Sequence, residues 1–105
     1  MVFKINHLVF AALVGVAACA GRAIPVAGPA DVARAAERYP GVTEADLASG
    51  RTLFASHCGA CHAPPAPTSK AADVWPGEIH EMKERARLDD AQARLVERYL
   101  VTMAR

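Results

Sequence analysis

The sequence predicts an all-α domain of three or four helices, and three observations support this fold class. No segment alternates apolar and polar residues with the period of two that a half-buried strand requires. Apolar residues instead recur at intervals of three or four, most regularly near the C-terminus. An Asp or Thr, residues that commonly cap helices, precedes each helical segment.

The first 18 residues have the layout of a secretory signal peptide. Lys4 stands near the start, and an apolar stretch from Leu8 to Ala18 ends in small residues. The end of this stretch together with the next residue reads "VAAC", residues 16–19, and resembles the lipobox of bacterial lipoproteins. This resemblance implies that Cys19 receives a diacylglyceryl thioether and becomes the mature N-terminus. The alternative is cleavage after Ala20, which would remove Cys19. Both interpretations predict export, and a lipid on Cys19 would hold the protein on the periplasmic side of a bacterial membrane.

Residues 19–30 are rich in Ala, Gly and Pro and show no periodicity, so we expect a flexible tether that precedes a domain of residues 31–105. Loss of residues 1–18 removes Lys4 alone among the charged residues. The mature chain then has eleven Lys and Arg against eleven Asp and Glu. A formal charge of zero argues against nucleic-acid binding.

The first two helices are expected before the central loop. Asp31 is the expected N-cap of a short helix that ends before Pro40. A second helix begins at Thr43, which forms an approximate capping box with Asp46, and continues to Cys58. A glycine inside a helix costs about 1 kcal/mol relative to alanine. Gly50 therefore indicates that another segment packs closely against this helix.

Two more helices are expected after the loop. Three prolines make residues 62–72 an extended loop, because proline removes backbone donors and fixes φ. A third helix is predicted from Asp73 to Leu88, with Pro76 in its first turn. Asp89 and Asp90 cap a fourth helix over residues 91–105. Its apolar stripe consists of Leu95, Val96, Tyr99, Leu100 and Met103.

The stretch "CGACH", residues 58–62, is the main functional signal. Zinc is disfavoured because structural sites usually use a second, distant ligand pair and the sequence has no second cysteine pair. A thioredoxin-like dithiol is disfavoured because its motif starts a helix after a strand, whereas this one ends a helix. Attachment of a c-type haem uses two cysteines at this spacing, followed directly by histidine. Export agrees with that chemistry.

On these residues the domain resembles the class I monohaem cytochromes c, over residues 43–103. The resemblance implies a small helical bundle around one covalent haem c, with Cys58 and Cys61 as thioether attachments and His62 as proximal iron ligand. It also implies that the first and last helices of the domain cross, with Gly50 against Tyr99. The chain departs from the family in its middle, where the long loop that carries the axial methionine is replaced by a short proline-rich loop and a helix.

The sixth ligand of the haem iron is therefore sought in the third predicted helix. At 100° per residue, Trp75, Ile79, Met82 and Ala86 share one face, while His80 lies about 200° from Met82 among charged residues. Met82 is accordingly the expected distal ligand, with His80 or an open site as alternatives.

The remaining candidates have other expected roles. Met103 is expected in the core and His57 at the surface. A carbonyl from the region of Pro64, Pro65 and Pro67 is expected to accept a hydrogen bond from His62 Nδ1. Trp75 is expected either to cover a haem edge or bind a propionate, or to be a core aromatic.

Two axial protein ligands leave no vacancy at the iron, so the expected function is one-electron transfer with transient redox partners. The alternative is a module that binds or senses CO, NO or oxygen at an open sixth position. A catalytic role is not expected, because no distal acid–base set can be placed around the haem.

Overall fold

A computed structural model of the chain describes residues 23–60 and 62–105. The expected signal peptide, Cys19 and Cys61 lie outside the described residues. The described part contains four α-helices and no strand, so the all-α prediction is confirmed. The helices are α1 (Pro29–Arg38), α2 (Glu44–Leu53), α3 (Trp75–Met82) and α4 (Asp90–Met103), with a π-helical turn, Phe54–Cys58, directly after α2 and a 3-10 turn, Pro67–Ser69, in the central loop.

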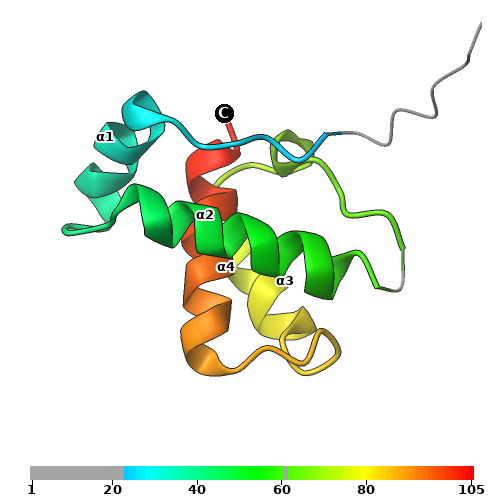
Figure 1. Cartoon of the computed structure of the whole chain (residues 1–105). Coiled ribbons are helices and arrows are strands. Elements are labelled where there is room, and N and C mark those ends of the chain that lie inside the picture. Colours follow the sequence, from blue (N-terminus) through cyan, green and yellow to red (C-terminus); the bar gives the residue numbers. More distant parts are fainter. Residues whose placement is uncertain (1–22, 61) are drawn as a thin grey trace, which may run out of the picture.

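The crossing of α2 and α4 is the centre of the fold (Figure 1). Gly50 is buried there, and a Cβ atom added to it would lie 2.8 Å from the Cβ of Tyr99. The predicted contact between this glycine and this aromatic residue is thus confirmed. The Phe54 and Tyr99 rings also pack, with centroids 6.2 Å apart. The most deeply buried side chains all belong to this region: Tyr99, Phe54, Leu47, Leu100 and Val96.

The predicted capping residues of α2 and α4 are confirmed. Thr43 Oγ1 accepts a hydrogen bond from the Asp46 amide (3.1 Å), and Asp46 Oδ2 accepts one from the Thr43 amide (2.9 Å). Asp89 and Gln92 make the same reciprocal pair at the start of α4. Each pair satisfies amide groups that have no partner inside the helix. Pro76 lies in the first turn of α3, as predicted.

The start of α1 differs from the prediction. The helix begins at Pro29, and Asp31 is its third residue rather than its N-cap. Proline suits the first helical position because its φ is already helical and no N–H is lost there. Asp31 still serves the helix start, because its Oδ2 accepts a hydrogen bond from the Gly28 amide at 2.9 Å. Its other oxygen lies 2.7 Å from Arg34 and 3.2 Å from Arg105.

The third helix is shorter than predicted at both ends. It runs from Trp75 to Met82, so the predicted start at Asp73 and the end at Leu88 are wrong. The chain turns after Met82, and Arg87 adopts a left-handed φ of 55°. This turn brings Leu88 into the core, where it is 6% exposed. Burial of one leucine therefore outweighs the helical preference of the preceding residues.

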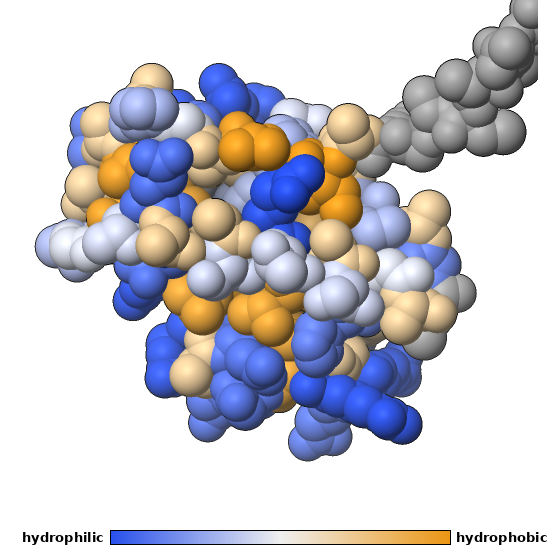
Figure 2. Space-filling view, in the orientation of Figure 1, coloured by the Kyte–Doolittle hydropathy of each residue, from blue (hydrophilic) through white to orange (hydrophobic). Residues whose placement is uncertain are grey.

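The segment before α1, residues 24–28, lies against the helices, although the sequence analysis assigned it to the tether. Ala27 is buried, and the main chain of the segment accepts hydrogen bonds from α2 and α4. None of the helices in the described ranges has the length and apolar character that crossing a membrane requires. Figure 2 shows strongly hydrophilic residues at the end of the molecule where α4 begins, and residues of intermediate hydropathy over α2.

Candidate functional site

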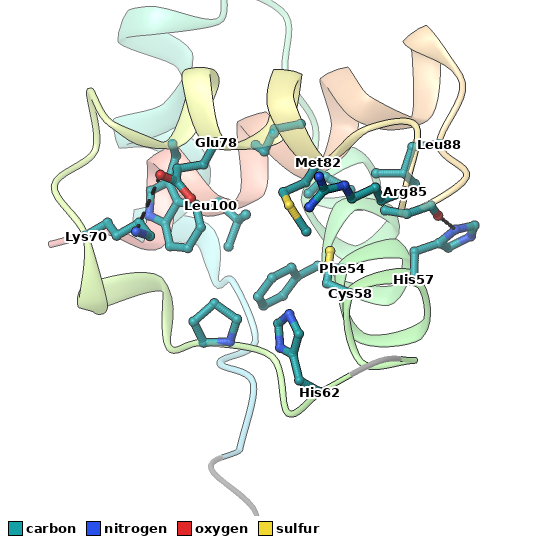
Figure 3. A pocket seen from close by; sticks show the side chains of 15 residues that line it. Phe54, His57, Cys58, His62, Lys70, Glu78, Met82, Arg85, Leu88 and Leu100 are labelled. Atoms are coloured by element: carbon teal, nitrogen blue, oxygen red, sulfur yellow. Dashed lines mark hydrogen bonds and ion pairs between the residues drawn. The ribbon is translucent and has the colours of Figure 1, made fainter.

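An open cavity of about 320 Å³ lies between the π-helical turn, the central loop, α3 and α4 (Figure 3). Its volume falls in the range of small-molecule and cofactor sites, roughly 300–1,000 Å³. The walls are mainly apolar, and six of the lining side chains belong to the core: Phe54, Trp75, Ile79, Leu88, Val96 and Leu100. The helix crossing and α3 together therefore leave an apolar hollow at the end of α2.

The π-helical turn positions Cys58 in the wall of this cavity. Single π-helical turns are rare and occur frequently at functional sites. Cys58 is half-buried, and this burial raises the pKa of its thiol. The thiol is therefore neutral at physiological pH and suits an apolar wall. The second expected attachment residue, Cys61, lies outside the described residues.

His62 lines the same cavity from the central loop. Its Nδ1 lies 3.0 Å from the carbonyl oxygen of Ala63, its neighbour in the chain. The acceptor thus lies at the start of the expected proline-rich region, directly before Pro64. An Nδ1–H that donates to this oxygen leaves Nε2 with its lone pair, which is the tautomer that ligates a metal through Nε2.

The face of α3 predicted to point inward does so. Trp75 and Ile79 are buried, and Met82, 37% exposed, lines the cavity. His80 is exposed and does not line it. In the view of Figure 3, the Met82 thioether and the His62 ring point into the cavity from opposite sides, and Phe54 and Cys58 are drawn between them. Residues 20 positions apart in the sequence thus approach from opposite walls.

Trp75 fastens the central loop to α3. Its indole N–H donates a hydrogen bond to the Pro67 carbonyl at 2.9 Å, and this bond is buried. Because the indole has a single donor, Trp75 has none left for a propionate in this arrangement. Of the roles expected for Trp75, the structure favours packing in the cavity wall. Met103 is buried in the core, as predicted.

His57 was expected at the surface, but it is half-buried and lines the cavity. Its Nδ1 lies 2.7 Å from the carbonyl oxygen of Ala86 in the segment after α3. This contact joins the π-helical turn to the opposite wall of the cavity. Sequence reasoning missed it because no local pattern links residues 29 positions apart.

Charged side chains line the rim. Lys70 Nζ lies 3.5 Å from Glu78 Oε1, and Arg85 lies beside Met82 (Figure 3). No sequence pattern singles out these residues, since charged positions on a helix usually face solvent. Within the described ranges, no three His, Cys, Asp or Glu side chains gather closely enough to hold a metal ion by themselves.

Comparison of the chain with models of protein families, with curated proteins and with solved structures finds no match. The function must therefore be inferred from the residues of this chain and their arrangement.

Proposed function

We propose that the chain is an exported monohaem cytochrome c of the class I type that carries single electrons. The observation that carries the proposal is the placement of Met82 and His62 on facing walls of an apolar cavity, with Cys58 in the wall between them. A thioether, an imidazole and a thiol in these positions would supply two iron ligands and one of the two attachment points of a c-type haem. Cys61 supplies the second attachment.

The cavity suits a c-type haem in three respects. Its apolar lining matches a flat apolar ring, and Phe54 and Leu100 offer packing surface. Arg85 brings positive charge to the rim, which suits a propionate carboxylate, while the charge of Lys70 is paired with Glu78. The neutral thiol of Cys58 becomes an equally neutral thioether on attachment, so no charge has to be solvated in the wall.

The bound haem supplies a one-electron iron couple. His62 offers Nε2 as proximal ligand, oriented by the contact between its Nδ1 and Ala63. Met82 offers its thioether from α3, a ligand type that raises the reduction potential. Together these two residues would hold the iron and leave no vacancy for a substrate. The packed crossing of α2 and α4 keeps the walls in place when the charge at the site changes.

The rest of the proposal concerns location and partners. The signal peptide and a lipid on Cys19 place the domain on the periplasmic face of a bacterial membrane. Its partners are other redox proteins that it meets transiently. Residues 52–69, which carry the attachment motif, contain no Lys, Arg, Asp or Glu. Any dependence of docking on ionic strength would therefore come from the charged residues of the cavity rim, Lys70, Glu78 and Arg85.

A second function has one observation in its favour. Met82 is the last residue of α3 and is 37% exposed, so a small movement of the helix end would withdraw its sulfur from the cavity. The sixth position would then be open to CO, NO or oxygen, as in a haem-based ligand-binding or sensing module.

The two functions differ in what the Met82→Leu variant does. Leucine keeps most of the apolar volume but cannot ligate iron. For an electron carrier we expect the ferrous wild type to bind CO poorly, and the variant to bind it readily with a shifted absorption spectrum. His80→Ala, an exposed change on the same helix, is the matched control and leaves both properties unchanged. Ready CO binding by the wild type, with an unchanged spectrum in Met82→Leu, would contradict the carrier function.

A further inference from the structure

Residues 24–28, which we call the strap, are held by two hydrogen bonds from the helix crossing. The Tyr99 hydroxyl donates to the Pro25 carbonyl at 2.6 Å, and Arg51 Nε donates to the Ile24 carbonyl at 2.9 Å. One donor comes from each of α4 and α2. Figure 1 shows the strap running alongside the helices from α1 toward the central loop.

The residues around these two hydrogen bonds are buried, so the bonds help to stabilise the fold. Tyr99 is 0% exposed, and the strap carbonyl is the partner that its hydroxyl has in the described structure. Ala27 is 6% exposed, and Ile24 packs against the core. Release of the strap would expose this apolar surface and leave a buried hydroxyl without its acceptor, which is unfavourable on both counts. The strap is therefore part of the folded domain.

The strap shortens the length of chain between Cys19 and the domain. A chain spans at most about 3.6 Å per residue. If the chain were free as far as residue 31, the domain would range about 40 Å from Cys19. With Ile24 held by Arg51, the reach falls to about 18 Å.

We propose that the strap, together with a lipid on Cys19, keeps the haem domain next to the membrane surface, within reach of redox proteins of the same membrane. The inference rests on the lipid anchor of the proposed function, and not on the identity of the sixth ligand. The strap acts by shortening the free chain, because the hydrogen bonds from Tyr99 and Arg51 set the residue at which the tether ends.

The first test asks whether the strap is fixed. In the purified holoprotein, ¹⁵N relaxation should give Ile24, Val26 and Ala27 order parameters near 0.85, the value of rigid backbone. Tyr99→Phe should lower the values at these residues and leave those of α3 unchanged. Values below about 0.6 in the wild type are typical of flexible chain and would overturn the proposal.

The second test measures the distance from the membrane. The lipidated protein is bound to phosphatidylcholine vesicles that carry a fluorescent headgroup label, and quenching of the label by the haem is recorded. Ten Gly and Ser residues inserted after Gly21 raise the mean reach of the chain between Cys19 and Ile24 from about 12 Å to about 21 Å, so we expect quenching to fall. The same insert at the exposed Gly41 turn is the control, and it should leave quenching unchanged.

The second test distinguishes failure of the strap proposal from failure of the proposed electron carrier. Equal quenching with and without the insert after Gly21 would overturn the proposal. An intact mass that shows Cys19 without a lipid would also overturn it, while the haem absorption of the same sample reports separately on the proposed electron carrier.

Discussion

Gly50 of α2 and Tyr99 of α4 lie against each other where the two helices cross. A Cβ atom on Gly50 would come within 2.8 Å of the Tyr99 Cβ and closer still to the Leu95 carbonyl oxygen. The backbone of α4 thus occupies the space that any other side chain at position 50 would need. This contact fixes the distance between the helices whose ends form the cavity.

Gly50→Ala is expected to destabilise the protein by about 1–3 kcal/mol, because the added methyl group meets backbone rather than a side chain that can move. The loss should appear in spite of the better helix propensity of alanine. Gly77→Ala is the matched control, since Gly77 lies in α3 with nothing within 4 Å of an added Cβ. That variant should be stabilised by about 0.5–1 kcal/mol. Equal urea midpoints for the two variants would contradict the close approach.

Tyr99 is expected to make stability depend on alkaline pH. Burial raises the pKa of its hydroxyl from 10.0 to about 12. The folded protein then holds this proton more tightly than the unfolded chain, so its contribution is complete below pH 10 and is lost as the pH rises toward about 12. The free energy of unfolding of Tyr99→Phe should be lower near neutral pH but fall less steeply over this range. Parallel pH profiles for the two proteins would count against a buried hydroxyl.

Asp31 is expected to make stability depend on acidic pH. Its hydrogen bond from the Gly28 amide, followed by that from Arg34, lowers the pKa of the carboxyl below 3.8. This contribution is complete above the unfolded pKa and is lost as the pH falls through the lower folded value. Asp31→Asn should cost about 1 kcal/mol at pH 7 and flatten the acid limb of the unfolding profile. A variant with an unaltered acid limb would show that the carboxylate network contributes nothing.

His57→Ala is expected to loosen the segment after α3. The variant loses the hydrogen bond to the Ala86 carbonyl, at a cost of about 0.5–1.5 kcal/mol. Amide exchange in residues 83–88 should accelerate, since the contact joins this segment to the π-helical turn. His80→Ala removes an exposed imidazole from α3 and should change neither exchange nor stability. Unchanged exchange in His57→Ala would indicate that the contact does not hold the segment.

Features of the fold that depend on neighbouring residues could be predicted from the sequence. The reciprocal bonds of Thr43 with Asp46 follow from residue types three positions apart. The inward face of α3 follows from helical periodicity, which placed Met82 in the cavity wall and His80 outside it. The contact at Gly50 came instead from resemblance to a family, because one glycine indicates close packing without naming its partner.

Features that depend on distant residues could not be predicted. The end of α3 at Met82 is set by burial of Leu88, since residues 83–87 would otherwise favour helix. The strap looked like a linker because its bonds to Arg51 and Tyr99 use backbone carbonyls, which every residue has. The His57 contact also ends on a carbonyl. Sequence patterns give no sign of such acceptors.

Covalent attachment of one haem is the central claim, and the intact mass under denaturing conditions tests it most directly. The chain would be expressed with its signal peptide in bacteria that mature c-type cytochromes, then purified and unfolded before the measurement. We expect the mass of the processed chain plus one haem, and the mass of the processed chain alone when Cys58 and Cys61 are both replaced by serine. A wild-type mass without the haem, with both thiols still available to alkylation, would contradict the account.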